Sequence, residues 1–287
     1  MLRVAFFGSD GEFSGRSLVG VAARHAVVAI VAPPAPRRTL RSLLRTLRGG
    51  PRFTLARLAR APMYHAASGN DTVALAAISD TRPDVICIAG YPWLIPPDVF
   101  LKPRLGAINL HGSLLPRHRG ILPLFWIYHH DDRDTGVTVH RVTEQADAGA
   151  ILGQDSFALP RGLPVDSLNS MNAERGGVLL AATLDALERG AVEGRAQDER
   201  LATPAPRVAP GAAMVDFEHW GVERVWHFLA GLYPHFQEPL VDGAGGVVRY
   251  RGVRGFRSES HDRSPGHVER TAQGLALYCR DGIAELW

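Results

Sequence analysis

Two apolar runs with a helical segment between them open the chain. Residues 2–7 and 25–31 are almost entirely apolar, whereas residues 13–24 carry apolar side chains at the spacing of a helix. Strands that are apolar at every position, rather than at every second one, are typical of a parallel sheet with helices packed on both faces. We therefore predict an α/β fold with a Rossmann-like, mostly parallel sheet and helices on both faces.

The same alternation continues far along the chain. Further strands are predicted at residues 84–89, 105–111, 135–142 and 151–158, and further helices at residues 71–81, 122–130 and 165–189. A proline-rich stretch at residues 202–211 is typical of a linker, and beyond it a helix at residues 222–232 precedes short strand-and-turn units. Short strands at such spacing indicate a small barrel. We expect a larger domain over residues 1–203, a linker over residues 204–213 and a second domain over residues 214–287.

Composition narrows the class of protein. With 46% hydrophobic and 21% charged residues, the 287-residue chain resembles ordinary soluble globular proteins. No apolar run approaches the roughly 18 residues that span a bilayer, and the apolar start is too short for a signal peptide. We therefore expect a cytoplasmic protein without membrane insertion. The glycines of the first loop lack the dinucleotide-binding spacing, so no NAD site is predicted.

Residue types that often bind metals are present but poorly spaced. Cys87 and Cys279 are too few and too far apart for a disulfide or zinc framework, so both are expected to stay reduced. The His-His-Asp-Asp run at residues 129–132 follows a predicted helix, where adjacent side chains diverge by roughly 100° and cannot readily converge on one ion. No metal site is predicted.

A long basic stretch interrupts the first domain. Residues 33–70 contain no acidic residue but carry eight arginines, and the leucines within residues 40–47 recur at helical spacing. An amphipathic helix with a cationic face is predicted there. Three roles remain open for residues 37–60: a solvated surface, a surface facing the phosphates of a nucleotide-linked substrate, and a nucleic-acid or acidic-membrane surface. The net charge of +3 is too small to select a nucleic acid.

The stretch at residues 108–120, INLHGSLLPRHRG, carries the polar residues best suited to catalysis. Asn109 and His111 are two positions apart in a predicted strand, so both side chains point to the same face. The strand ends in a loop with glycine and proline, at the carboxyl edge where open α/β sheets bind ligands. An amide that donates to a developing oxyanion and an imidazole that moves a proton together favour acyl transfer.

Three sequence blocks, at residues 109–120, 135–140 and 147–149, resemble the signature of the 10-formyltetrahydrofolate-dependent formyltransferases. This family includes glycinamide ribonucleotide, methionyl-tRNA and amino-sugar formyltransferases. The blocks stand in the family's order, and Asp147 follows His111 by 36 positions. The resemblance implies an N-formyltransferase whose formyl donor is 10-formyltetrahydrofolate. It also implies that the small C-terminal domain is an OB-like β-barrel.

The same resemblance gives three residues catalytic roles. An amine would attack the formyl carbon, Asn109 would stabilise the tetrahedral oxyanion, and His111 would shuttle the proton. Asp147 would hold the imidazole and favour its charged form. Ser113 is not expected to be a nucleophile, because the elbow motif that surrounds a catalytic serine is absent.

Contacts with the formyl donor are assigned by the resemblance as well. In the family, the loop that corresponds to residues 93–95 lines the pterin pocket, and the loop at residues 113–116 resembles a second segment in contact with the folate. The predicted donor-binding residues are Trp93, Leu94, Ile95, Ser113, Leu114, Leu115, Pro116, Thr143, Glu144, Gln145 and Ala146. Ile121 replaces an arginine that follows this second loop in aminoarabinose enzymes, which removes a cationic contact from the folate region.

The acceptor is expected to be a small-molecule primary amine. The three blocks are most similar to those of amino-sugar enzymes, which favours a nucleotide-linked amino sugar. Methionyl-tRNA is the alternative, although the Gly-Arg-Gly-Lys type sequence of the basic loop that meets tRNA in such enzymes is absent here. A small hydroxylamine or amino acid is a third candidate. A non-catalytic module that binds tRNA or a membrane is disfavoured by the intact catalytic residues.

Overall fold

The computed structural model describes residues 1–34, 54–58, 60–68 and 72–287. The amphipathic helix predicted within residues 40–47 lies outside these described residues. The chain forms two compact units, which comprise Met1–Ile121, Gly136–Ser156 and Asn169–Pro204 in one, and Leu122–Thr135, Phe157–Leu168 and Ala205–Trp287 in the other. Within the described ranges, no helix combines the length and the apolar character needed to cross a membrane.

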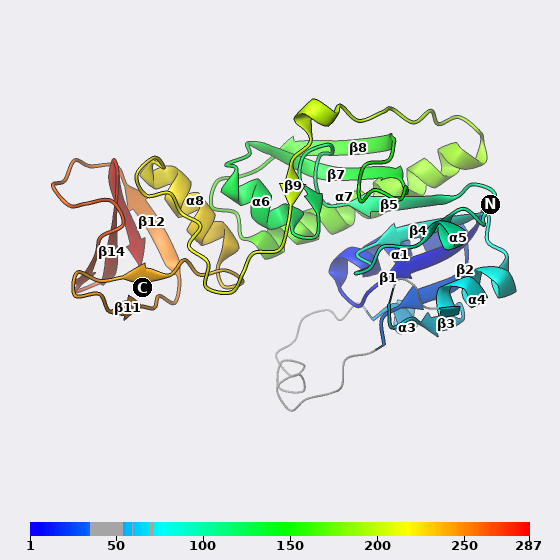
Figure 1. The fold of residues 1–287 in the computed structure, drawn as a ribbon, viewed down its shortest axis with the longest axis horizontal. Coiled ribbons are helices and arrows are strands. Elements are labelled where there is room, and N and C mark those ends of the chain that lie inside the picture. The colour runs from blue at the N-terminus through cyan, green and yellow to red at the C-terminus, as the bar shows by residue number, and fades with distance from the viewer. Residues whose placement is uncertain (35–53, 59, 69–71) are drawn as a thin grey trace. The chain divides into compact units, whose positions relative to one another are not determined.

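The first unit is built on a seven-stranded sheet (Figure 1). Its strands, in spatial order, are β3 (Met63–His65), β2 (Ala26–Ala32), β1 (Arg3–Gly8), β4 (Val85–Ala89), β5 (Ala107–His111), β7 (Asp134–Arg141) and β8 (Ile151–Ala158). The pairs from β3 to β5 are parallel, and β7 runs antiparallel to β5. The predicted α/β class and mainly parallel sheet are therefore confirmed, although β3 was not predicted. The two-residue strands β6 (Arg119–Gly120) and β9 (Pro204–Ala205) form a separate small sheet.

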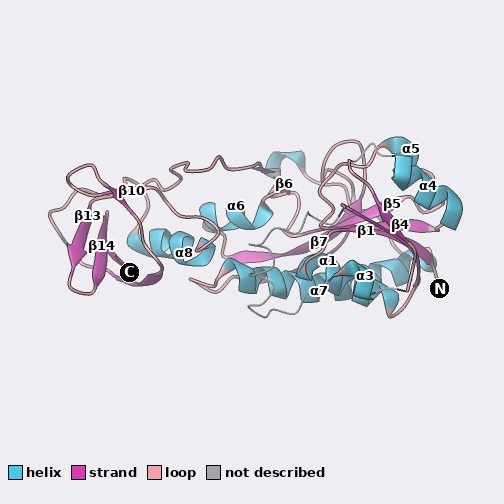
Figure 2. Ribbon diagram, turned by 90° about the horizontal axis from the view of Figure 1, so that it is seen from below, coloured by secondary structure: helices cyan, strands magenta, loops and turns pink. Residues whose placement is uncertain are grey.

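Helices cover both faces of the large sheet (Figure 2). One face carries α1 (Glu12–Ala22), α3 (Leu55–Leu58) and α7 (Val165–Glu188), and the other carries α4 (Thr72–Thr81) and α5 (Pro97–Phe100). Side chains alternate along β1, because Val4 and Phe6 pack in the core beneath the first group and Ala5 and Phe7 pack in the core beneath the second. Burial on both faces explains why the strands are apolar at successive positions.

Helices α1 and α7 approach each other at two glycines. A Cβ atom added to Gly20 would lie 2.5 Å from the carbonyl oxygen of Gly177. Because backbone cannot retreat as a flexible side chain can, we expect Gly20→Ala to lower the free energy of unfolding by about 1–3 kcal/mol. Urea unfolding measures the change, and Val19→Ala, at an exposed neighbouring position, is the control. A Gly20→Ala protein as stable as the wild type would contradict the close approach.

The second unit combines two helices with two antiparallel sheets. Its helices are α6 (Pro123–His129) and α8 (Val222–Leu232). Strand β10 (Leu240–Val241) pairs with β11 (Val247–Val248), and a four-stranded sheet has the order β12 (Val253–Arg257), β15 (Gly282–Leu286), β14 (Gly274–Cys279) and β13 (Val268–Thr271). The short strand-and-turn units predicted after residue 232 did not include residues 253–257, so β12 was not predicted. Closure of these strands into an OB-like β-barrel stays a prediction.

A shared core holds the second unit together. Phe125 and Tyr128 of α6 pack with Phe228 and Leu229 of α8 in one cluster of buried side chains. Aromatic rings contribute a large apolar area to such a core. The contacts of α6 therefore place it with the C-terminal strands, although its sequence position lies within the first predicted domain.

Candidate active site

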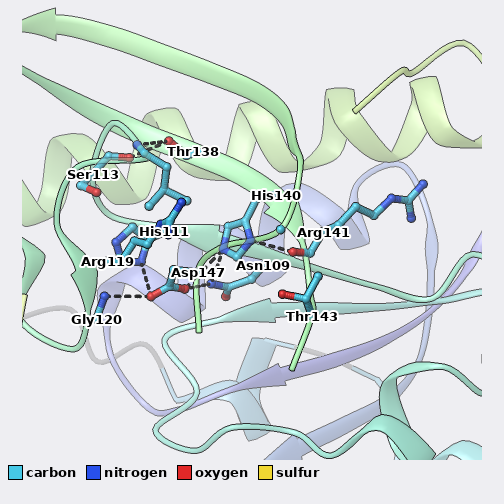
Figure 3. Close-up of polar contacts among 12 residues, drawn as sticks. Asn109, His111, Ser113, Arg119, Gly120, Thr138, His140, Arg141, Thr143 and Asp147 are labelled. Carbon is cyan, nitrogen blue, oxygen red and sulfur yellow. Dashed lines mark hydrogen bonds and ion pairs between the residues drawn. The ribbon is translucent and has the colours of Figure 1, made fainter. Parts of the chain in front are cut away.

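Asn109 and His111 lie on β5 beside a strand that adds two polar side chains. In the register of β5 and β7, Asn109 is opposite His140 and His111 is opposite Thr138. Because directly opposite residues of an antiparallel pair point to the same face, these four side chains share one face of the sheet (Figure 3). His111, His140 and Thr138 are buried, and Asn109 is partly exposed.

The loop after β7 brings Asp147 to these side chains. Oδ2 of Asp147 accepts the Gly120 N–H at 2.9 Å and lies 3.7 Å from Nδ1 of His111. Oδ1 of Asp147 accepts from Nδ2 of Asn109 at 3.3 Å. The structure thus brings Asn109, His111 and Asp147 together, as Figure 3 shows, although 38 positions separate the first from the last.

The hydrogen bonds of His111 fix the position of its proton. Nε2 lies 2.8 Å from the carbonyl oxygen of His118, and because a carbonyl can only accept, Nε2 is the donor. In the neutral ring Nδ1 is then the basic atom, and it faces Asp147. Burial lowers the pKa of His111, although the negative charge of Asp147 acts in the opposite direction. The ring is therefore neutral at pH 7 and able to take up a proton at Nδ1.

Asp147 is a carboxylate at neutral pH. Burial by itself would raise the pKa of Asp147, but the nearby imidazoles of His111 and His140 and the Gly120 N–H outweigh burial and lower this pKa to about 2. A permanent negative charge therefore lies beside Nδ1 of His111. Such a charge stabilises the imidazolium that forms when the ring takes up a proton.

Sequence reasoning gave His140 no role, although it contacts Asn109. Nδ1 of His140 lies 2.8 Å from the Arg141 carbonyl oxygen and therefore donates, which leaves Nε2 to accept from Nδ2 of Asn109 at 3.1 Å. This contact determines which way the Asn109 amide points. The signal in the sequence was the alternation of β7, which places Thr138 and His140 two positions apart, as Asn109 and His111 are in β5.

Thr138 holds the loop that we predicted to contact the donor. Its Oγ1 donates to the Ser113 carbonyl oxygen at 2.7 Å and accepts the Leu115 N–H at 3.1 Å. The Ser113 hydroxyl donates to the Arg117 carbonyl oxygen at 2.8 Å, within the same loop. Ser113 and Leu115 are buried, whereas Leu114 and Pro116 remain partly exposed, so the latter two are the members of this loop that a ligand can reach. 

The other predicted donor contacts lie in two places. A surface hollow of about 590 Å³ is lined by Phe100, Leu101, Val142, Thr143, Glu144, Gln145, Ala148 and Glu199. Ala146 is exposed in the same loop but is not among the lining residues. Trp93 is partly exposed, Leu94 is 67% exposed, and Ile95 is buried in the core of the first unit. The hollow is therefore lined by three of the four predicted contacts from the Asp147 loop, Thr143, Glu144 and Gln145, and by none of those at residues 93–95.

The described histidine, cysteine and acidic residues offer neither a metal site nor a reactive thiol. Those residues contain no group of three or more histidine, cysteine or acidic side chains that could hold a metal ion. Cys87 and Cys279 are free and buried. Burial raises the pKa of both thiols, that of Cys279 to about 12, so both are protonated at neutral pH.

The chain is similar in sequence to known formyltransferases. The sequence model of the family described as Formyl transferase matches residues 2–183. The methionyl-tRNA formyltransferase of Acidobacterium capsulatum is 34% identical over 216 residues, which cover 74% of this chain and 68% of that one. The methionyl-tRNA formyltransferase of Roseiflexus castenholzii is 32% identical over 219 residues, which cover 75% of this chain and 68% of that one.

Solved structures share the fold at lower identity. An N-formyltransferase from Helicobacter canadensis, solved with folinic acid and dTDP-3-aminofucose, matches with a TM-score of 0.71 over 100% of both chains at 13% identity. HypX from Aquifex aeolicus, solved with tetrahydrofolic acid, matches with a TM-score of 0.64 at 17% identity, over 99% of this chain and 43% of HypX. These two likenesses concern the fold alone. The matches in sequence go further, and they show that this chain belongs to the formyl transferase family.

Proposed function

We propose that the chain transfers a formyl group from 10-formyltetrahydrofolate to the primary amine of a nucleotide-linked amino sugar. The observation that carries the chemistry is the meeting of an amide nitrogen, an imidazole and a carboxylate in Asn109, His111 and Asp147. Acyl transfer to nitrogen needs a hydrogen-bond donor for the oxyanion and a group that removes a proton from the attacking amine. These side chains supply both.

His111 moves the proton in this reaction. A neutral amine attacks the formyl carbon, and its nitrogen becomes acidic as the new C–N bond forms. Nδ1 of His111, neutral at the start, takes up this proton, and the carboxylate of Asp147 stabilises the resulting imidazolium. The imidazolium then returns the proton to N10 of the folate as the bond between N10 and the formyl carbon breaks. Tetrahydrofolate is the leaving group.

Asn109 stabilises the oxyanion. Its Nδ2 carries two hydrogens, and it lies 3.1 Å from Nε2 of His140 and 3.3 Å from Oδ1 of Asp147. The contact with Asp147 is longer than the usual N–H···O range of about 2.7–3.2 Å, so a developing oxyanion can compete with Asp147 for this hydrogen while the amide stays in place. A single donor of this kind contributes about 10²- to 10³-fold to turnover. The contact with His140 keeps the amide from rotating away.

The hollow beside the Asp147 loop fits the formyl donor. Its volume of about 590 Å³ lies within the range of roughly 300–1,000 Å³ that is usual for ligand pockets. The lining combines apolar side chains such as Phe100 and Val142 with the polar Thr143 and Glu144. A pterin likewise presents apolar ring faces and a polar edge. Because the same loop carries Asp147, a donor bound here would lie against the loop that completes the catalytic group.

Two observations bear on the acceptor, and they favour different ones. Similarity of the three sequence blocks to amino-sugar enzymes favours a nucleotide-linked amino sugar, as does the full-length likeness to a Helicobacter canadensis enzyme solved with dTDP-3-aminofucose. The relatives in sequence are methionyl-tRNA formyltransferases, which makes methionyl initiator tRNA the second candidate. Both acceptors present a primary amine, so the catalytic residues suit either.

A panel of acceptors tests the proposal. The purified chain is incubated with 10-formyltetrahydrofolate and, separately, with a dTDP-linked 3-amino sugar, a nucleotide-linked 4-amino sugar, methionyl initiator tRNA and a small hydroxylamine. Mass spectrometry then detects the gain of one formyl group, and a His111→Asn protein treated in parallel is the control for chemistry without the base. We expect formylation of a nucleotide-linked amino sugar. Formylation of the tRNA alone would select the second candidate, and formylation of none would contradict these acceptor classes.

A further inference from the structure

A short segment after α7 contacts the loop that carries Asp147. This segment, residues 195–203, includes the 3-10 helix η1 (Glu199–Leu201). Nε2 of Gln197 donates to the main-chain carbonyl oxygens of Asp147 and Gly149, at 2.7 Å each. Both hydrogens of the Gln197 amide are therefore directed at the Asp147 loop.

Arg119 holds the other end of the Gln197 amide. Oε1 of Gln197 accepts from Nε of Arg119 at 3.1 Å and from Nη2 of Arg119 at 2.8 Å. The Arg119 guanidinium also forms a two-armed ion pair with Glu199, with both distances at 2.8 Å, and the Arg119 side chain is only 10% exposed. The orientation of the amide is thus determined, because its oxygen must face the guanidinium and its nitrogen must face the carbonyls.

Arg119 also connects this segment to the loop after β5. The Arg119 N–H donates to the Thr203 carbonyl oxygen at 2.8 Å. The next residue, Gly120, donates its N–H to Oδ2 of Asp147 at 2.9 Å. Gln197 therefore holds the main chain of Asp147, and the residue after Arg119 holds its carboxylate.

Asp147 needs such support because its backbone is left-handed. Its φ of 53° is uncommon for a residue with a side chain, and conformations of this kind persist where surrounding contacts impose them. The carbonyl that Gln197 binds belongs to the residue whose carboxylate faces His111. A rotation of this backbone would swing the carboxylate away from Nδ1 of His111.

We propose that Gln197 is a positioning residue for formyl transfer: its amide, held by Arg119, fixes the main chain of Asp147 so that the carboxylate stays beside Nδ1 of His111. Gln197 acts through Asp147. The inference rests on the proposed roles of His111 and Asp147, but it concerns the geometry of one loop and is independent of which amine is the acceptor.

Titration of His111 tests the inference without any acceptor. The titratable groups that act on the ring are Asp147, which raises the pKa of His111, and His140 and His118, which lower it. Gln197→Met keeps the length of the side chain but cannot donate, so the carboxylate should move away and the pKa of His111 should fall below its wild-type value. Nuclear magnetic resonance of carbon-13-labelled histidines measures this pKa, and His111→Asn identifies the signal. An unchanged His111 titration would overturn the inference.

Turnover provides a second measurement. With the acceptor that the panel identifies, kcat of Gln197→Met should fall about 10²-fold, the cost of a misplacement of about 1 Å, while KM changes little. Adding Gln197→Met to Asp147→Asn should lower kcat no further than Asp147→Asn alone, because both changes act through one carboxylate. Independent, additive losses would overturn the inference. A merely structural glutamine would lower the melting temperature and leave the His111 titration of the folded protein in place.

Matched variants separate the possible failures. Arg200→Gln changes the same segment at a side chain that is 88% exposed and pairs with Asp198, so it should keep the wild-type titration and kcat. Gln197→Ala repeats the titration if the methionine variant does not fold. Loss of activity in His111→Asn with normal activity in Gln197→Met would refute the inference and leave the proposed function standing. Activity retained in His111→Asn would refute the proposed role of His111, whereas no formylation of any acceptor by the wild type would refute the proposed function; in both cases the titration would still decide whether Gln197 positions Asp147.

Discussion

Replacing His111 with asparagine is expected to lower kcat by about 10²- to 10⁴-fold, the usual contribution of general acid–base catalysis. Nδ1 of His111 is the basic atom beside the Asp147 carboxylate, and an asparagine amide takes up no proton at neutral pH. KM should change little, because the ring is only 6% exposed and its proposed part lies in the chemical step. Steady-state kinetics with the acceptor identified by the panel measures both constants.

The matched control for this variant is an exposed histidine of the first unit. His65 is the last residue of β3 and is exposed, so His65→Asn should leave kcat unchanged. An asparagine at position 111 matches the imidazole only as far as Nδ1 and loses the Nε2 donation to the His118 carbonyl, so circular dichroism must first show that the variant is folded. A folded His111→Asn protein with wild-type turnover would remove His111 from the mechanism.

The pairing of Asn109 with His111 could be predicted because it follows a local rule. Side chains two positions apart in a strand lie on the same face of the sheet, whichever strand pairs with it. The position of Asp147 beside His111 could not be predicted from such a local rule. It lies in a loop with a left-handed backbone, where no periodic pattern applies, and only the resemblance between sequence blocks connected it to His111.

The contacts of His140 and Gln197 could not be predicted from a local repeat, because they depend on how distant segments of the chain pair. His140 meets Asn109 because β7 runs antiparallel to β5 in one particular register. Gln197 reaches the main chain of Asp147 from 50 positions further along the sequence. A side chain whose partners are main-chain carbonyls leaves no complementary residue type in the sequence that would mark the contact.

The assignment of helices to the two compact units depends on contacts between distant segments in the same way. Helix α6 was predicted from its apolar pattern, but an apolar face does not specify which core it will enter. Phe125 and Tyr128 pack with Phe228, which comes about a hundred positions later. Long-range packing of this kind, and not local propensity, determines which unit a helix joins.

Asp147→Asn is expected to lower kcat by about 10²-fold and to move the acidic limb of the pH profile to lower pH. The amide keeps the shape of the carboxylate and can still accept the Gly120 N–H, but it carries no charge to stabilise the imidazolium. Because the charge of Asp147 raises the pKa of His111, removing it lowers that pKa further. The base then stays neutral at more acidic pH. Profiles of kcat against pH for both proteins measure the shift.

The free energy of unfolding of Asp147→Asn tests the charge of the Asp147 carboxylate independently of catalysis. Folding lowers the pKa of Asp147 from 3.8 to about 2, so the ionised carboxylate contributes stability that is present above about pH 4 and is lost as the pH falls toward 2. The wild type should therefore be the more stable protein at neutral pH, and its advantage over the variant should narrow in acid. Urea unfolding at about pH 7 and about pH 3 measures this advantage. If the stability advantage of the wild type over Asp147→Asn instead grew in acid, Asp147 would not be a charged group beside His111. An unchanged acidic limb in the kcat profile of the variant would contradict the same assignment.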